Sequence, residues 1–292
     1  MFKKAMKKIT CGVLALTSVV ACAGTLTACE TSHPEVEMTV SFNGKDYVLE
    51  YKLYRKLAPN TVNHFIWLAE NGYYDGVCVH DYNEDSLRMY TGAYEAAESD
   101  SDDDGLAYKA YYDFAKEHAD SFPASVWSDE GKTDPTYTLY GEFASNNFRV
   151  ESGALKEQFG ALTMYYYAKD TAHKVWATRA DSKGEVSKRD YKYNSTTSMF
   201  YISMTETETT NNDYCTFATL EEDGVEELKD LMEAIDAYID ATYGEEDDKE
   251  FTSQKTVRVD ADDAIVGEAT TNKKFNVPNK AITIKSVKVT KY

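Results

Sequence analysis

Apolar and polar residues alternate from Val36 to Tyr54, on both sides of an Asn43-Gly44 pair. Alternation with a period of two is typical of a strand that buries one face, and Asn-Gly favours the tight turn of a β-hairpin. The pattern therefore predicts two antiparallel strands that are joined at this pair.

Two other segments have the spacing of an amphipathic helix. In the first, residues 58–72, Pro59 suits the first helical turn and Gly72 suits the left-handed position just past the end. Its apolar stripe consists of Val62, Phe65, Ile66 and Ala69. The second segment, residues 224–239, has the same periodicity, so we expect two helices that each bury one face.

Short strand-like runs fill much of the remaining chain, and three long polar excursions interrupt them. The runs lie at residues 76–80, 86–92, 160–167, 198–204, 213–220 and 281–289. The excursions lie near residues 94–138, 168–193 and 243–272. The composition of residues 168–193 indicates a long exposed loop. Many strands and two helices indicate a mainly β fold, and we expect a closed barrel because closure removes exposed sheet edges.

The first residues have the features of a targeting segment. A basic start, MFKKAMKK, precedes an apolar run, and LTAC follows the run at residues 26–29. This tetrapeptide resembles the bacterial lipobox, which implies cleavage before Cys29 and diacylglycerol on its thiol, with Cys22 as a weaker candidate. The chain then divides into a lipoprotein signal peptide, a tether and a folded domain, at residues 1–28, 29–35 and 36–292.

This division predicts a location for the protein. Lipid on Cys29 would hold the domain at the extracytoplasmic face of the bacterial cell membrane without spanning the membrane. An ordinary signal peptide with a chance cysteine is the alternative interpretation.

Charge and cysteine content restrict the partners. The formal net charge is −19, so phosphate backbones would repel the chain, and we expect no nucleic-acid partner. After Cys29 the cysteines are Cys78 and Cys215, too few for a disulfide framework. These two either form a single bridge or stay as separate buried thiols.

Metal ligands show no convincing arrangement. Asp100 to Gly105 has the sequence DSDDDG, the first half of a calcium loop, but Tyr111 stands where such a loop ends in glutamate. We interpret this segment as a plain acidic loop. The five histidines show no zinc spacing, so we expect neither a metal nor another cofactor.

Residues 58–81, APNTVNHFIWLAENGYYDGVCVHD, resemble the opening of a cyclophilin-type peptidyl-prolyl isomerase. Weaker similarities follow in the family's chain order, at YGEF...NNF (140–148), GALTM (160–164), NSTTSMFYI (194–202) and YCTFATL (214–220). The resemblance implies an eight-stranded antiparallel barrel capped by two helices, with a groove that binds X-Pro peptides. It also implies catalysed rotation about the X-Pro amide, whose uncatalysed barrier is about 18–20 kcal/mol.

The chain departs from the family at the catalytic position. The family's site needs a fixed cation at the prolyl nitrogen, and arginine suits this role because it is always charged and presents a rigid fork of donors. That arginine would follow His80, where this chain has Asp81. Arg88 is a candidate for a relocated arginine, but strand alternation places it opposite Met89 and Thr91, so it would need a bulge to enter the groove. A solvated surface arginine is the alternative.

The resemblance also assigns residues that line the groove. They are Met89, Thr91, Met164, Tyr165, Met199, Tyr201, Tyr214 and Phe217. Ordinary barrel core explains the same apolar residues nearly as well. We expect a membrane-anchored isomerase of secreted, proline-containing chains, with activity that is weak or absent because of Asp81. The alternatives are a non-catalytic peptide- or partner-binding lipoprotein and, resting on tyrosine richness alone, a carbohydrate-binding surface protein.

Overall fold

The computed structural model describes residues 32–97, 105–149, 155–166, 174–179, 182–190, 197–244, 251–259 and 271–292. The predicted signal peptide, Cys29 and nearly all of the acidic run from Asp100 to Gly105 lie outside these residues. Within the described residues, no helix has the length and apolar character that crossing a membrane requires.

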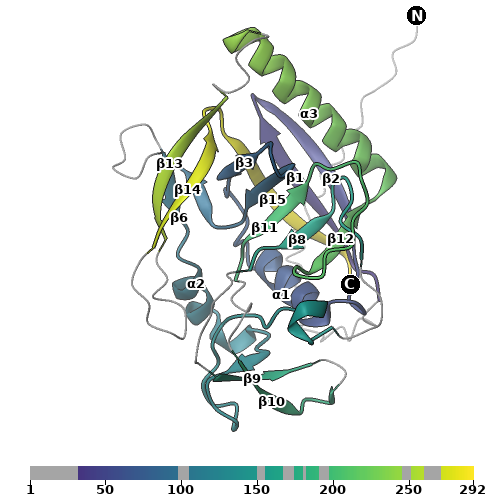
Figure 1. Cartoon of the computed structure of the whole chain (residues 1–292), viewed down its shortest axis with the longest axis vertical. Coiled ribbons are helices and arrows are strands. Elements are labelled where there is room, and N and C mark those ends of the chain that lie inside the picture. Colours follow the sequence, from purple (N-terminus) through teal and green to yellow (C-terminus); the bar gives the residue numbers. More distant parts are fainter. Residues whose placement is uncertain are drawn as a thin grey trace, which may run out of the picture.

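The centre of the fold is a curled antiparallel sheet of eight strands (Figure 1). Its order is β15 (Ile282–Lys291), β1 (Glu35–Phe42), β2 (Lys45–Leu53), β12 (Thr216–Leu220), β8 (Leu162–Met164), β11 (Phe200–Ser203), β4 (Arg88–Thr91) and β3 (Asp81–Asn83). β1 and β2 form the predicted hairpin and pair along their whole length. At the turn, Asn43 and Gly44 have φ of 47° and 84°, the left-handed values that an Asn-Gly turn requires.

The sheet is open, which corrects the prediction of a closed barrel. Among the described residues, the edge strands β3 and β15 do not pair with each other. Residues 76–79, just before β3, make three backbone hydrogen bonds with Ile282 and Ile284 of β15, at 2.7–2.8 Å. From His80 onward the backbone pairs with β4 instead. The contact with β15 is therefore too short to close the sheet.

The two predicted helices are present, and both lie against the sheet (Figure 1). α1 (Pro59–Glu70) packs on β15 and buries its predicted apolar stripe, whereas α3 (Glu222–Tyr243) packs on β2. Pro59 lies in the first turn of α1, and Gly72 has φ of 70° just past the end, as predicted. A short third helix, α2 (Tyr111–Glu117), lies in the first excursion.

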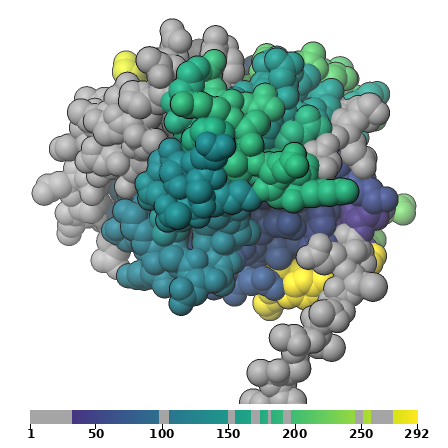
Figure 2. Space-filling view, turned by 90° about the horizontal axis from the view of Figure 1, so that it is seen from below, coloured from purple at the N-terminus to yellow at the C-terminus, as the bar shows by residue number. Residues whose placement is uncertain are grey.

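The excursions contain small sheets as well as loops. The first holds β5 (Tyr94–Ala96), β6 (Leu106–Tyr108) and β7 (Val126–Trp127), and the last holds β13 (Thr252–Val259) and the start of β14 (Thr271–Pro278). Single 3₁₀ turns occupy Ala119–Ser121 and Ala144–Asn146. In the view from below, the teal residues of the first excursion and the segment after it form much of the surface at this end (Figure 2).

The prediction of a loop over residues 168–193 is wrong. β9 (Lys174–Thr178) and β10 (Val186–Asp190) form a hairpin there, and β9 also pairs with β7. Val175 and Ala177 of β9 pack into a small separate core. This short apolar alternation is surrounded by charged residues, which masks it in the sequence.

Most of the buried side chains belong to one core between the sheet and the helices α1 and α3. Large aromatic residues from distant parts of the chain fill it, among them Tyr47, Tyr51, Phe65, Phe200 and Phe217. A smaller cluster lies between β5, β6 and β14. Cys78 and Cys215 are separate, buried free thiols, so they do not form the single bridge that the sequence left open.

Candidate functional site

Strand alternation divides β4 between the core and the outer face of the sheet. In its register with β11, Arg88 and Tyr90 lie on the same face as Tyr201. Met89 and Thr91 point to the opposite side and are buried. Arg88 therefore reaches the outer face of the sheet without a bulge.

Five of the predicted groove residues lie in the interior. They are Met89, Thr91, Met164, Met199 and Phe217, and none is more than 7% exposed. The Thr91 hydroxyl is used internally, since it donates to the carbonyl of Cys78 at 2.9 Å. A peptide on the outer face of the sheet would not reach such side chains. Their role in substrate binding stays a prediction, and their burial does not favour it.

Four tyrosines pack together on the outer face of β4, β8 and β11, and we call them the tyrosine cluster. They are Tyr90, Tyr165, Tyr201 and Tyr214, of which the family resemblance assigns all but Tyr90. Ring centroids lie 5.8 Å apart for Tyr90–Tyr165, 5.3 Å for Tyr90–Tyr201 and 6.2 Å for Tyr201–Tyr214. These separations are typical of favourable aromatic pairs. Tyr201 is buried, and the other three are half-buried, so the face presents rigid amphipathic rings of the kind that suits peptide contact.

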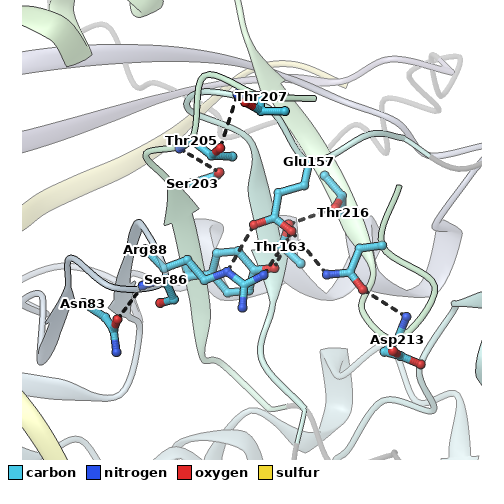
Figure 3. A network of polar contacts seen from close by, with 12 residues as sticks. Asn83, Ser86, Arg88, Glu157, Thr163, Ser203, Thr205, Thr207, Asp213 and Thr216 are labelled. Carbon is cyan, nitrogen blue, oxygen red and sulfur yellow. Dashed lines mark hydrogen bonds and ion pairs between the residues drawn. The ribbon is translucent and has the colours of Figure 1, made fainter. Parts of the chain in front are cut away.

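Arg88 is held over this cluster by an ion pair with Glu157 (Figure 3). Its Nε and Nη2 donate to the two carboxylate oxygens at 3.1 and 3.2 Å, which is a bidentate arrangement. The guanidinium carbon lies 4.4 Å from the ring centre of Tyr201 and 5.7 Å from that of Tyr214, distances at which both rings attract the cation. Arg88 is therefore a fixed part of the face and not a freely solvated arginine.

Glu157 connects the ion pair to its surroundings. Its carboxylate also accepts hydrogen bonds from the Tyr201 hydroxyl at 3.1 Å and from Asn211 Nδ2 at 3.2 Å. The backbone of Glu157 pairs with that of Thr209, and its side chain is only 5% exposed. The loop before β12 is thereby tied to the strand that carries Arg88.

Glu157, Asn211 and Tyr90 are not among the residues predicted from the sequence. Glu157 is 69 residues from Arg88 along the chain, and neither it nor Asn211 belongs to a recognisable motif. Tyr90 could have been found, because alternation places it on the same face as Arg88.

Asp81 anchors an inserted hairpin. Its Oδ1 accepts the backbone N–H of Asn276 in β14 at 2.9 Å, and β14 packs along β3. Burial raises the pKa of Asp81, and the hydrogen bond from Asn276 opposes that rise. The side chain at the position that the resemblance assigns to arginine thus has a structural partner in the β13–β14 hairpin.

His80, next to Asp81, contacts the same hairpin from the interior. Its ring lies 4.9 Å, centre to centre, from Tyr94 and also from Phe275 of β14. Neither ring nitrogen has a hydrogen-bond partner in the described part of the chain. Burial lowers the pKa of His80 to about 3, so the ring is neutral near pH 7.

Glu142, from the YGEF segment, holds the first turn of α1. It accepts the backbone N–H groups of Asn60 and Thr61 at 3.2 and 2.9 Å, and the Thr61 hydroxyl at 2.8 Å. A carboxylate at this place satisfies donors that the first helical turn leaves free. Burial raises the pKa of Glu142 to about 7, although these hydrogen bonds oppose the rise. Two segments that carry the family resemblance are joined by this contact.

No metal site is evident in the residues that the structure describes. Nowhere among them do three His, Cys, Asp or Glu side chains gather in a way that could hold an ion. The acidic run that begins at Asp100 lies outside the described residues up to Gly105.

The family follows from comparison of the sequence with known protein families. Residues 36–260 match the model described as cyclophilin type peptidyl-prolyl cis-trans isomerase/CLD. The chain belongs to the cyclophilin-type peptidyl-prolyl isomerase family. No curated protein matches this cyclophilin-type chain at the sequence level.

Two solved structures of a cyclophilin type peptidyl-prolyl cis-trans isomerase from Cryptosporidium parvum are similar to it. One is 16% identical and has a TM-score of 0.41, covering 89% of this chain and 99% of that chain. The other, in the presence of the dipeptide Ala-Pro, is 16% identical and has a TM-score of 0.42, covering 88% of this chain and 99% of that chain.

We expect the Asp81–Asn276 hydrogen bond to stabilise this cyclophilin-type domain. Asp81→Ala removes the acceptor and leaves the N–H of Asn276 without its partner, so it should lower the free energy of unfolding by about 1–3 kcal/mol. Asp81→Asn keeps a side-chain oxygen and should keep most of the stability. Urea denaturation measures both variants, and equal losses in the two, or none in either, would contradict the anchoring role.

We also expect acid to destabilise the domain through His80. The native ring stays neutral down to about pH 3, whereas an unfolded histidine takes up its proton at about pH 6.5. The unfolded state therefore binds more protons as the pH falls from 7 to 5, which lowers the free energy of unfolding by on the order of 2 kcal/mol.

His80→Leu should remove this contribution, so its urea denaturation should differ less between pH 7 and pH 5 than that of the wild type. His33→Leu, near the start of the described chain, serves as the control and should behave as the wild type does. An unchanged pH dependence in His80→Leu would show that His80 is not held neutral.

Proposed function

We propose that this cyclophilin-type domain binds X-Pro segments of unfolded secreted proteins on the tyrosine cluster and isomerises them weakly or not at all. The observation that carries the proposal is the hydrogen bond from Asn276 to Asp81. This hydrogen bond supports reduced activity for two reasons. The residue at the family's arginine position is an acid, and its carboxylate oxygen already accepts a hydrogen bond from the backbone of an inserted hairpin.

The chemistry of the reaction explains why this substitution matters. Rotation about an X-Pro amide has an uncatalysed barrier of about 18–20 kcal/mol. A cation that hydrogen-bonds the prolyl nitrogen weakens the amide resonance as the bond twists. An ionised carboxylate has no N–H or O–H to donate, and its charge repels the carbonyl oxygens of a bound peptide. Any residual turnover would depend on Arg88, the cation on the same face as the tyrosine cluster.

The proposal includes attachment to the extracytoplasmic face of a bacterial membrane through diacylglycerol on Cys29. Its support is the order of the basic start, the apolar run and LTAC at residues 26–29. The net charge of −19 disfavours attraction to anionic lipids. A covalent lipid would therefore supply the attachment that the protein surface does not.

A non-catalytic peptide- or partner-binding lipoprotein is the second candidate. The observation that favours it is that the tyrosine rings pack against one another, with Tyr201 buried beneath Arg88. Such a face offers contact area rather than a hollow for a proline ring. Peptide binding without any turnover would distinguish this candidate from a weak isomerase.

We expect the full chain to turn over X-Pro peptides far more slowly than the Cryptosporidium parvum cyclophilin when both are measured in a protease-coupled assay. Arg88→Ala should abolish whatever turnover there is, whereas Asp81→Ala should not abolish it, because an ionised carboxylate has no donor for the amide. Turnover equal to that of the reference cyclophilin would refute the proposed loss of activity.

We expect Cys29→Ser to release the protein from the membrane fraction of a bacterium that expresses it, and to prevent incorporation of labelled fatty acid. Cys22→Ser is the matched control and should leave both unchanged, because Cys22 precedes the expected cleavage site. Continued lipid labelling of Cys29→Ser would contradict the assignment of the anchor.

A further inference from the structure

Four donors from within the chain bind the carboxylate of Glu157. An ionised carboxylate has about four acceptor positions. Arg88 Nε donates to Oε1, whereas Arg88 Nη2, the Tyr201 hydroxyl and Asn211 Nδ2 all donate to Oε2, at 3.1–3.2 Å. With its side chain 5% exposed, Glu157 presents almost no surface to a ligand. Its contribution is to fix the position of Arg88.

Arg88, by contrast, keeps donors that Glu157 does not use. A guanidinium has five N–H groups, and Glu157 accepts from two of them. The Tyr90 hydroxyl also interacts with the group, and 22% of the Arg88 side chain is exposed. The remaining N–H groups, on Nη1 and Nη2, are therefore held in a fixed orientation beside half-buried tyrosine rings.

The charges of the pair determine which ligand this site suits. The positive charge of Arg88 is balanced by Glu157 at hydrogen-bond distance, within a chain whose net charge is −19. A carboxylate or phosphate ligand would thus meet little net attraction, whereas a neutral carbonyl oxygen needs only oriented donors.

We propose that Arg88 binds a backbone carbonyl oxygen of the peptide and that Glu157 is the positioning residue that makes this possible. The site takes uncharged stretches of extended peptide, with an apolar ring such as proline against the tyrosine cluster. This inference rests on the proposed function, because it names the chemical group that the peptide-binding face recognises.

The opposite role for Glu157 makes a different prediction. If Glu157 withheld Arg88 from ligands, its removal would free the guanidinium and strengthen peptide binding. If Glu157 positions Arg88, its removal lets the side chain swing away from Tyr201, and binding weakens. The direction of the change in affinity decides between the two roles.

The experiment measures peptide affinity for the full chain by isothermal titration calorimetry. One probe is a blocked, neutral tetrapeptide that contains Ala-Pro, and the other is the same peptide with a free C-terminal carboxylate. We expect Arg88→Ala to weaken binding of the neutral peptide about tenfold or more, the loss of one hydrogen bond to a charged group. Glu157→Ala should cause a similar loss, and the double variant should bind no more weakly than either single variant.

Glu157→Gln provides a readout that a purely structural role would not change. It keeps the shape of the side chain and one oxygen acceptor but leaves the charge of Arg88 unbalanced. We expect the preference for the neutral peptide over the carboxylate peptide to fall or reverse in this variant. The exposed pair Lys156–Glu208, beside Glu157 in the chain, supplies the control, since Glu208→Gln should leave both affinities unchanged.

Three results would overturn the assignment. Tighter or unchanged binding in Glu157→Ala would show that Glu157 does not position Arg88. If the wild type binds the peptide and Arg88→Ala binds it equally well, Arg88 is not the group that binds the carbonyl oxygen, although the domain still binds peptides. A wild type that binds neither peptide would refute the proposed function together with the site. Circular dichroism of each variant verifies the fold, and Glu157→Gln tests the assignment even if Glu157→Ala does not fold.

Discussion

The hydrogen bond between the Asp81 carboxylate and the backbone of β14 is the constraint on which the functional side of this cyclophilin depends. At 2.9 Å it attaches the inserted β13–β14 hairpin to β3, and Phe275 of the same hairpin packs against His80. The resemblance to cyclophilins places a catalytic arginine at residue 81. A side chain that anchors an insertion as a hydrogen-bond acceptor cannot also donate to a twisting amide, which supports the proposal of weak or absent turnover.

A second polar arrangement gives the outer face a different character. Arg88 and Glu157 form a neutral ion pair. Arg88 lies over the ring of Tyr201, and the nearly buried Glu157 is tied to the loop before β12 through Asn211. Pairing removes most of the long-range attraction of the cation but leaves oriented N–H donors. Half-buried tyrosine rings lie beside the pair. In the proposed site, these donors and rings suit binding of an uncharged peptide backbone better than they suit stabilising a charge that develops during a reaction. The two arrangements together support the proposal of a face that binds peptides and isomerises them weakly or not at all.

The sequence predicted those parts of the fold that local physics determines. The Asn43-Gly44 hairpin and the helix from Pro59 with its Gly72 end are confirmed, because turn chemistry and helical periodicity act over a few residues. The open sheet and the pairing of the β9–β10 hairpin with β7 depend on contacts between distant segments, and the predictions of a closed barrel and of a loop were wrong. At the site, alternation separated Arg88 from Met89 correctly. The resemblance assigned binding roles both to buried residues such as Met89 and to Tyr165, Tyr201 and Tyr214 of the tyrosine cluster, and these roles stay predictions. Glu157 could not be predicted, because its partners lie tens of residues away along the chain and no motif contains it.

The most direct test of this account is an NMR titration of the isotope-labelled domain with an X-Pro peptide, in which exchange spectroscopy also follows the cis and trans forms of the peptide. The account predicts shifts for the amides of Tyr90 and Tyr201, an unchanged amide of Asn276, and little acceleration of peptide exchange. A displaced Asn276 signal together with rapid exchange would contradict it, because the hairpin would then leave Asp81 and the ordinary cyclophilin position would take part in turnover.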